Sequence, residues 1–338
     1  MESSNPLREA ELMMTRRQLF GRSALGLGTL ALSDLFSPSG MASQETPPWV
    51  GGTHHRAKAK RVIYLFMSGG PSHLDLWDYK PKLKEKYNQQ LPDHVRSGQR
   101  VTGMTANQKS GFPLAPSKYA FTRHENNDRG LWVSELLPHT ATVAKELCVV
   151  HSTYTEAINH DPAKTFFCTG SEMPGRASMG SWLSYGLGSL NKDLPNFVVL
   201  SSAFWSGKVN VQALFSRLWG TGFLPGKHQG IAFQSVGDPV LFLSNPEGVD
   251  RSVRSKMLDF VAKVNAEDAE VSGDPEIHTS IAQQEMAFRM QASIPELTDL
   301  NSESESSLGL YGPEVSQSGS FARNCLLARR MAERDVRF

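Results

Sequence analysis

The stretch RVIYLFMSGGPSHLDLWDYKP, residues 61–81, joins a strand-length apolar run to a turn rich in glycine, proline and polar residues. The continuous apolar run from Arg61 to Met67 is typical of a strand buried on both faces of a sheet. Gly69 and Gly70 permit unusual backbone angles, and Pro71 then fixes the turn. This abrupt strand end predicts either the rim of a site or only a tight turn into a helix.

Strand and helix patterns alternate along the rest of the chain. LCVVHS (147–152) and NFVVLSS (196–202) read as further short buried strands. Helical spacing of apolar residues predicts helices over 131–146, 250–293 with a break at SGDP, and 320–334. This alternation predicts an α/β fold with a mostly parallel sheet that is covered by helices on both faces.

The last residues, RDVRF (334–338), look like the opening of another strand. A fold that ends as a core strand begins is unusual, so the pattern predicts a sheet that is incomplete at the C-terminus of this sequence and a chain that is truncated there.

The first residues have the pattern of an export signal. Arg16 and Arg17 precede an apolar run, Ala24–Leu32, that is far shorter than the roughly 20 residues of a membrane-spanning helix. The small residues before Ser43 offer a cleavage site, and the paired arginines resemble a twin-arginine signal. A surface amphipathic helix is the alternative, but the run lacks interleaved polar residues.

The sequence therefore divides into a signal over residues 1–42, a polar and glycine-rich linker over 43–60, and one domain over 61–338. We expect export by the twin-arginine route to the periplasm or cell surface, with no stable membrane span. The formal net charge of +1 without a basic stripe gives no reason to expect a nucleic-acid partner.

Two long motifs carry a family resemblance. They are IYLFMSGGPSHLDLWDYKP (63–81) and NHDPAKTFFCTGSEMPGRASMGSWLSYGLGSLNKDLPNFVVL (159–200). Both resemble the exported bacterial family known as domain of unknown function 1501, and the resemblance covers nearly all of residues 61–338. It implies a branch of the alkaline phosphatase and sulfatase superfamily. Such a branch would have a three-layer α/β/α fold, a divalent metal (zinc, calcium or magnesium) and sulfate or phosphate esters of small molecules or polysaccharides as substrates.

Sulfatases carry their nucleophile in a C/S-x-P-x-R pattern that is followed by TG one helix later. HDPAKTFFCTG is similar to that frame, with Pro162, Lys164, Thr169 and Gly170 in register. His160 then stands where the cysteine or serine nucleophile should be. The resemblance implies catalytic roles for His160 and Lys164, the latter on an ester oxygen at a helix N-terminus that favours anions.

A simpler interpretation of the same segment stays open. Asn159 or Asp161 is a good helix N-cap, and Asp161 before Pro162 is what capping alone would produce. In that case His160 only packs at the mouth of the helix.

Superfamily enzymes place a metal-binding aspartate where the first strand ends. The nearest candidates here are Asp75 and His73, which the turn at Gly69–Gly70 would bring to the carboxyl edge of the sheet. The alternative is a capping box between Ser72 and Asp75, which requires no metal. In the resembled superfamily most metal ligands lie in the C-terminal half, and no histidine follows residue 300 here.

Two aromatic or glycine-rich segments have a structural and a functional interpretation. Trp182 and Tyr185 are three residues apart and fit a helix core better than a substrate platform. WGTGFLPGKHQG (219–230) is either a lid over a site or a surface loop without a role. For the whole protein, a hydrolase and a non-catalytic periplasmic or cell-surface binding protein are the two hypotheses that follow.

Overall fold

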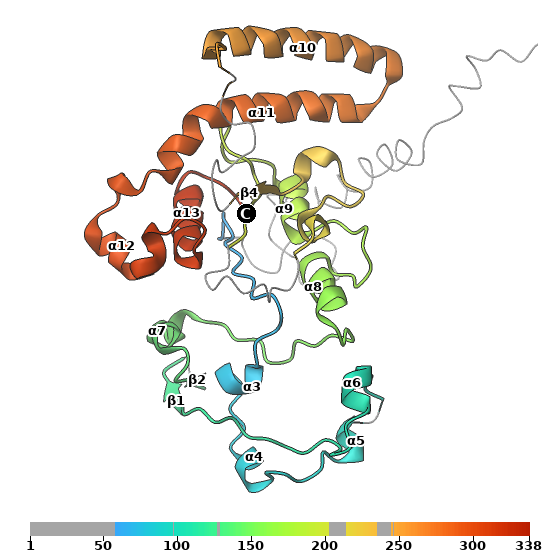
Figure 1. Cartoon of the computed structure of the whole chain (residues 1–338), viewed down its shortest axis with the longest axis vertical. Helices are drawn as coiled ribbons and strands as arrows, with labels where there is room; N and C mark the ends of the chain where they lie inside the picture. The colour runs from blue at the N-terminus through green and yellow to red at the C-terminus, as the bar shows by residue number, and fades with distance from the viewer. Residues whose placement is uncertain (1–57, 97, 127–128, 203–213, 235–244, 246) are drawn as a thin grey trace, which may run out of the picture. The chain divides into compact units, whose positions relative to one another are not determined.

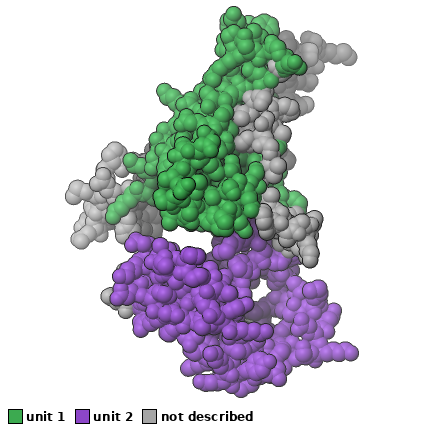
Figure 2. All heavy atoms as spheres, turned by 60° about the vertical axis from the view of Figure 1, so that its left-hand side comes forward, with its two compact units in different colours: residues 1–65, 168–338 green, residues 66–167 purple. Residues whose placement is uncertain are grey.

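The computed structural model describes residues 58–96, 98–126, 129–202, 214–234, 245 and 247–338 (Figure 1). It forms two compact units, residues 66–167 and residues 1–65 with 168–338, which are coloured separately in Figure 2. The predicted export signal, and all of the linker except residues 58–60, lie outside the described residues. None of the described helices is long and apolar enough to cross a membrane.

The unit of residues 66–167 has short elements and a small antiparallel hairpin. Its strands pair with Phe121 opposite Ser134, and Leu131, Val133 and Ala144 form its buried core. Tyr79 stacks on the hairpin, 5.1 Å from the Phe121 ring. The elements are α3 (His73–Leu76), α4 (Lys82–Glu85), α5 (Asp93–Arg96), α6 (Gly103–Ala106), β1 (Phe121–His124), β2 (Leu131–Ser134), α7 (Pro138–Thr142) and η1 (Ala144–Glu146).

The larger unit is mainly helical around a small parallel sheet. Helix α8 (His160–Thr169) leads into it from the first unit. The remaining elements are α9 (Met179–Leu187), β3 (Val198–Leu200), η2 (Ser216–Trp219), η3 (Gly226–His228), β4 (Ile231–Phe233), α10 (Arg251–Ser272), α11 (Pro275–Thr298), η4 (Leu300–Ser302), α12 (Glu305–Tyr311), η5 (Pro313–Ser316) and α13 (Phe321–Glu333). The chain is thus mixed α/β, and its sheets in the described residues are small.

Strands β3 and β4 pair in parallel, with Val198 opposite Ile231. Phe338 continues this arrangement, because its N–H donates to the Asn196 carbonyl (3.0 Å) and its carbonyl accepts from the Val198 N–H (2.9 Å). These two bonds have the pattern of a parallel pair. The strand predicted over 196–202 is confirmed at Val198–Leu200, whereas of RDVRF only Phe338 pairs with it, because Arg334 and Asp335 form a turn after α13.

Three predictions of secondary structure were wrong. The run from Arg61 to Met67 forms no strand, and Leu65 is 58% exposed; within the run, the Val62 N–H donates to the Arg337 carbonyl (2.8 Å). Residues 147–152 form no strand either. Residues 131–134 are strand β2 instead of helix, because pairing with β1 overrides their helical spacing.

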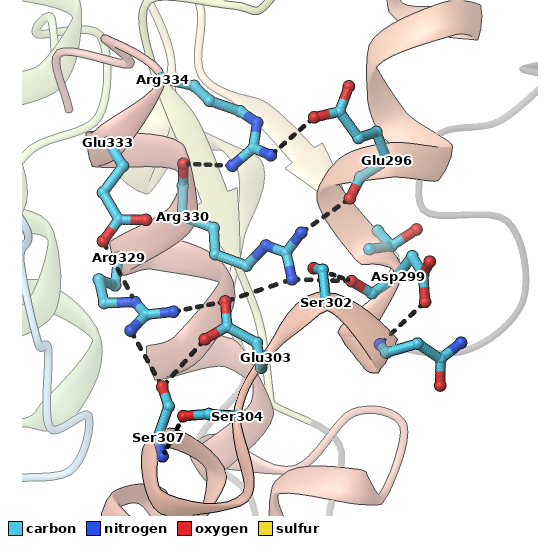
Figure 3. Close-up of polar contacts among 12 residues, drawn as sticks. Glu296, Asp299, Ser302, Glu303, Ser304, Ser307, Arg329, Arg330, Glu333 and Arg334 are labelled. Carbon is cyan, nitrogen blue, oxygen red and sulfur yellow. Dashed lines mark hydrogen bonds and ion pairs between the residues drawn. The ribbon is translucent and has the colours of Figure 1, made fainter.

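A buried arginine joins the C-terminal helices (Figure 3). Arg330 on α13 is 3% exposed, and its guanidinium donates to the carbonyls of Asp299 (2.7 Å) and Glu296 (2.9 Å). It also lies 3.3 Å from the Glu303 carboxylate, which Arg329 contacts at 2.5 Å. These carbonyls belong to the end of α11, where backbone acceptors have no partner within the helix.

The core beside this cluster comes from α11, α13 and the sheet. Met290, Ile294 and Leu297 of α11 are at most 1% exposed, and they pack with Met331 and Phe233. Removal of the Arg330 side chain would therefore leave buried carbonyls without donors next to a packed core.

We predict that Arg330→Ala lowers the free energy of unfolding by about 3 kcal/mol, because breaking a buried charge network leaves its partners unsatisfied. Arg334→Ala is the matched control, since Arg334 pairs at 3.0 Å with a Glu296 side chain that is 76% exposed. An exposed pair of this kind contributes about 1 kcal/mol or less. Denaturant unfolding of both variants measures the difference, and equal losses would contradict the account.

Candidate functional site

A cavity in the larger unit has a volume of about 320 Å³. That volume lies within the usual range of small-molecule sites. The walls come from the end of α8, the turn before α9, the first turn of α9 and the loop before β4. The lining residues are Thr169, Gly170, Ser171, Arg176, Ala177, Trp182 and Phe223.

The turn before α9 is fixed by its serines. Ser178 is the N-cap of α9, and its hydroxyl accepts from the Ser181 N–H at 3.3 Å. Ala177 is fully buried beside it. Gly180 packs against the Phe197 ring, where an added Cβ would lie 2.6 Å from ring carbons. These contacts fix the first turn of α9, from which Trp182 reaches the cavity.

The prediction that Trp182 is a core residue was wrong. Its side chain lines the cavity and is 45% exposed.

The loop over residues 219–230 is pinned to the same turn. The Gly220 carbonyl accepts from the Ser178 N–H and from the Ser181 hydroxyl, both at 3.0 Å. Gly222 has φ +56°, and a Cβ there would lie 2.5 Å from the Ala177 nitrogen and from the Arg176 carbonyl carbon. Only glycine fits this backbone-to-backbone contact.

Phe223 follows this contact and completes the aromatic side of the cavity. Its ring meets Trp182 edge to face, with centroids 5.5 Å apart and an interplanar angle of 70°. Both residues remain exposed: the exposed fraction is 52% for Phe223 and 45% for Trp182. Of the two interpretations of this loop, the geometry favours one in which the loop forms a wall of the site.

The opposite side of the cavity is polar. Arg176 is exposed and is the cation of the lining, and it forms no ion pair with any described carboxylate. The Thr169 hydroxyl donates to the Ser171 carbonyl (3.2 Å), and the Ser171 hydroxyl accepts from the Met173 N–H (3.2 Å). A cavity with one arginine, two hydroxyls and two aromatic rings is suited to a ligand that is anionic at one end and has a flat, weakly polar face at the other.

A polar pair that sequence reasoning missed lies behind α9. The Ser184 hydroxyl is 3.0 Å from His228 Nδ1, and Asn196 Nδ2 donates to Ser184 at 3.4 Å. Ser184 is only 2% exposed, so a substrate cannot reach it as a nucleophile. The pair instead links α9 to the loop that carries Phe223. No local sequence motif predicts this pair, because Ser184 and His228 are 44 residues apart.

Burial lowers the pKa of His228 to about 4, and repulsion from Lys227 acts in the same direction. The imidazole is therefore neutral at pH 7.

His160 and Lys164 both lie on α8, but in different surroundings. His160 begins the helix and is exposed, whereas Lys164 is 5% exposed. Thr169 and Gly170, which close the same sequence frame, reach the cavity at the other end of α8. His160 is not among the residues that line the cavity.

His73 and Asp75 share the short helix α3. Hydrogen bonds from the Ser117 and Ser72 hydroxyls lower the pKa of Asp75, with a smaller contribution from Lys118. The side chain of His73 is 73% exposed, and its Nε2 is 3.8 Å from the Asp78 carboxylate. Ser72 precedes α3 without a side-chain cap bond, so the capping-box alternative is wrong in its geometry.

A divalent metal needs several convergent ligands. The part of the chain that the structure describes contains no group of three or more His, Cys, Asp or Glu side chains placed to hold one. His73 and Asp75 are fewer ligands than such an ion needs, and their contribution to a metal site stays a prediction.

We predict that Gly222→Ala lowers the free energy of unfolding by at least about 3 kcal/mol, because the new Cβ meets backbone and the φ value is unfavourable for alanine. Gly170→Ala is the matched control: Gly170 has φ +74° but nothing within 4 Å of an added Cβ. Its expected loss is about 1–2 kcal/mol. Thermal and denaturant unfolding measure both, and a tolerated Gly222→Ala would show that the contact is not required.

We also predict that stability falls as the pH drops from 6.5 toward 4. In this window the unfolded chain, with an ordinary His228 pKa of 6.5, takes up a proton that the folded chain does not. His228→Gln should remove this part of the pH dependence while the contribution of the carboxylates remains. The measurement is the unfolding free energy of both proteins at several pH values, and parallel curves would contradict the burial of His228.

Comparison with known proteins gave one match. Residues 59–338 match the family described as Protein of unknown function (DUF1501). Neither a search of curated proteins nor a search of solved structures gave a match. The match includes every residue of the cavity and both predicted site pairs, and the chain belongs to the DUF1501 family.

Proposed function

We propose that this protein is an exported binding protein for saccharides that carry sulfate or phosphate esters. The observation that carries the proposal is the cavity of the larger unit, in which Arg176 faces no described carboxylate and lies among hydroxyls and two aromatic rings. An arginine fork matches the oxygens of a tetrahedral oxyanion and donates two parallel hydrogen bonds to them.

The aromatic wall supports a saccharide as the group that carries the ester. Trp182 and Phe223 offer large exposed faces that can cover the apolar C–H surface of a sugar ring. The hydroxyls of Thr169 and Ser171 are placed for hydrogen bonds with ring hydroxyls or ester oxygens. A polysaccharide end or a small ester both meet these requirements.

The sequence frame supports an ester instead of a simple carboxylate. Thr169 and Gly170 line the cavity and also occupy the TG positions of the sulfatase-like frame. We therefore place the chain in a branch of the alkaline phosphatase and sulfatase superfamily, with β4, β3 and Phe338 as part of a larger three-layer α/β/α sheet. Delivery to the periplasm or cell surface by the twin-arginine signal at Arg16 and Arg17 would bring it to such saccharides.

We predict that glucose 6-sulfate or glucose 6-phosphate binds and that unmodified glucose binds at least tenfold more weakly. Arg176→Ala should lower the affinity for the ester by about tenfold or more, since a hydrogen bond to a charged group contributes about 1.5–3 kcal/mol. Trp182→Ala should lower the affinity for the ester and the affinity for glucose by a similar factor. Isothermal titration calorimetry measures these affinities, with Arg100→Ala as a control for an exposed arginine outside the cavity. Unchanged binding by Arg176→Ala would refute the assignment.

Hydrolysis of the same esters is the second candidate function. It is favoured by the P-x-K…TG frame, in which Lys164 stands at the position of the sulfatase arginine in the first half of a helix. In this hypothesis His160 is the nucleophile, Lys164 holds an ester oxygen, and His73 and Asp75 contribute to a metal site.

We predict for this candidate that any turnover of 4-nitrophenyl sulfate or 4-nitrophenyl phosphate, measured with added zinc, calcium or magnesium, is lost in His160→Ala. His139→Ala is the control, since it removes an exposed histidine of α7. Full activity of His160→Ala would exclude His160 as the nucleophile. Unchanged metal affinity in Asp75→Asn would exclude Asp75 as a ligand.

A further inference from the structure

Helix α10 has an apolar face that the described residues leave uncovered. The helix has 22 residues, begins at the Asp250 cap, where the carboxylate accepts from the Val253 N–H at 2.9 Å, and ends at Gly273 in the left-handed conformation. Figure 1 shows it running alongside α11. Its inner face carries Leu258, Ala262, Ala266 and Ala269 at helical spacing, and Ala269 is 5% exposed. Of the described residues of α10, Ala269 on this face is the buried one.

A second apolar stripe lies on the opposite side of α10. Its members are Val253, Met257, Phe260, Val264 and Val271, whose exposed fractions are 42%, 49%, 68%, 47% and 89%. Their spacings of four, three, four and seven residues follow the heptad pattern of a coiled-coil seam. Single exposed apolar residues are ordinary, but five of them on one side of a helix over about 27 Å mark an interaction surface.

The distribution of charge along α10 indicates which partner packs against this stripe. Residues 251–261 contain three basic side chains and one acidic side chain, a net charge of +2. Residues 262–272 contain one basic and three acidic side chains, a net charge of −2. One flank of the stripe carries both signs of charge. Positions seven, eleven and fourteen residues after Lys256 lie on the same side of a helix, and they are Lys263, Glu267 and Glu270.

Two copies of α10 placed antiparallel would set the basic half of each against the acidic half of the other, with Val253 near Val271 of the second copy. A parallel arrangement would place like charges together. A membrane-surface helix is expected to have an excess of Lys and Arg on its polar face, whereas α10 has four basic and four acidic residues. We infer that α10 is a self-association surface, through which two copies of this chain pair antiparallel about a two-fold axis near Ala262.

Self-association of this kind would present two ester-binding cavities in one particle. A repeated saccharide chain could then occupy both, which raises the effective affinity without a new contact. The dimer stands independently of the cavity, since no lining residue belongs to α10.

The experiment is sedimentation velocity of the full chain over a range of concentrations. We expect a reversible monomer–dimer equilibrium that shifts toward monomer by at least tenfold in Phe260→Ser. Because Phe260 is 68% exposed, the variant should keep its fold, which circular dichroism checks. Leu310→Ser is the matched control, because Leu310 of α12 is 86% exposed and lies outside α10. This variant should not change the monomer–dimer equilibrium.

Orientation is tested by mixing copies that carry Val253→Cys with copies that carry Val271→Cys under oxidation. The antiparallel arrangement predicts cross-linked dimers in the mixture that exceed those of either variant alone or of the wild type with its own cysteines. A chain that stays monomeric at all concentrations, or a dimer unaffected by Phe260→Ser, would overturn the inference. Binding of the monomer to vesicles of anionic phospholipid through Phe260 would replace it with a membrane surface.

Discussion

Gly222 packs its α-carbon against the backbone of Arg176 and Ala177, closer than any side chain allows. This contact joins the loop before β4 to the turn before α9, and the hydrogen bonds of Gly220 to Ser178 and Ser181 hold the two segments in register. The aromatic wall and the cationic side of the cavity come from these two segments. The cavity therefore depends on a glycine at position 222, because a Cβ there would push the two segments apart.

The surrounding unit keeps these segments in place through polar groups that are buried and paired. Arg330 satisfies the end of α11, and Ser184 with neutral His228 links α9 to the loop that carries Phe223. Arg337 donates to the carbonyls of Leu187 (3.0 Å) and Gly188 (2.9 Å) at the end of α9. Each of these contacts satisfies backbone or side-chain atoms at a point where a helix or strand ends.

Long periodic segments were predictable from the sequence, whereas short ones were not. The helices predicted over 250–293, with a break at SGDP, and over 320–334 correspond to α10, α11 and α13, although α11 continues to Thr298. The apolar run at 61–67 has strand composition but forms no strand, because the sequence of a run does not specify its neighbours. In the cavity, Thr169 and Gly170 belong to the sulfatase-like motif, but that motif predicted His160 and Lys164 as the catalytic residues. Arg176 and Phe223 were missed because a contact between distant loops brings them together.

The most direct test of the central claim is a crystal structure of the protein with glucose 6-sulfate. The account predicts that the sulfate oxygens accept hydrogen bonds from the Arg176 guanidinium and that the sugar ring lies against Trp182, with Phe223 at its edge. A ligand bound at the His160 end of α8, or a cavity in which Arg176 contacts a carboxylate of this chain and the sulfate lies elsewhere, would contradict it.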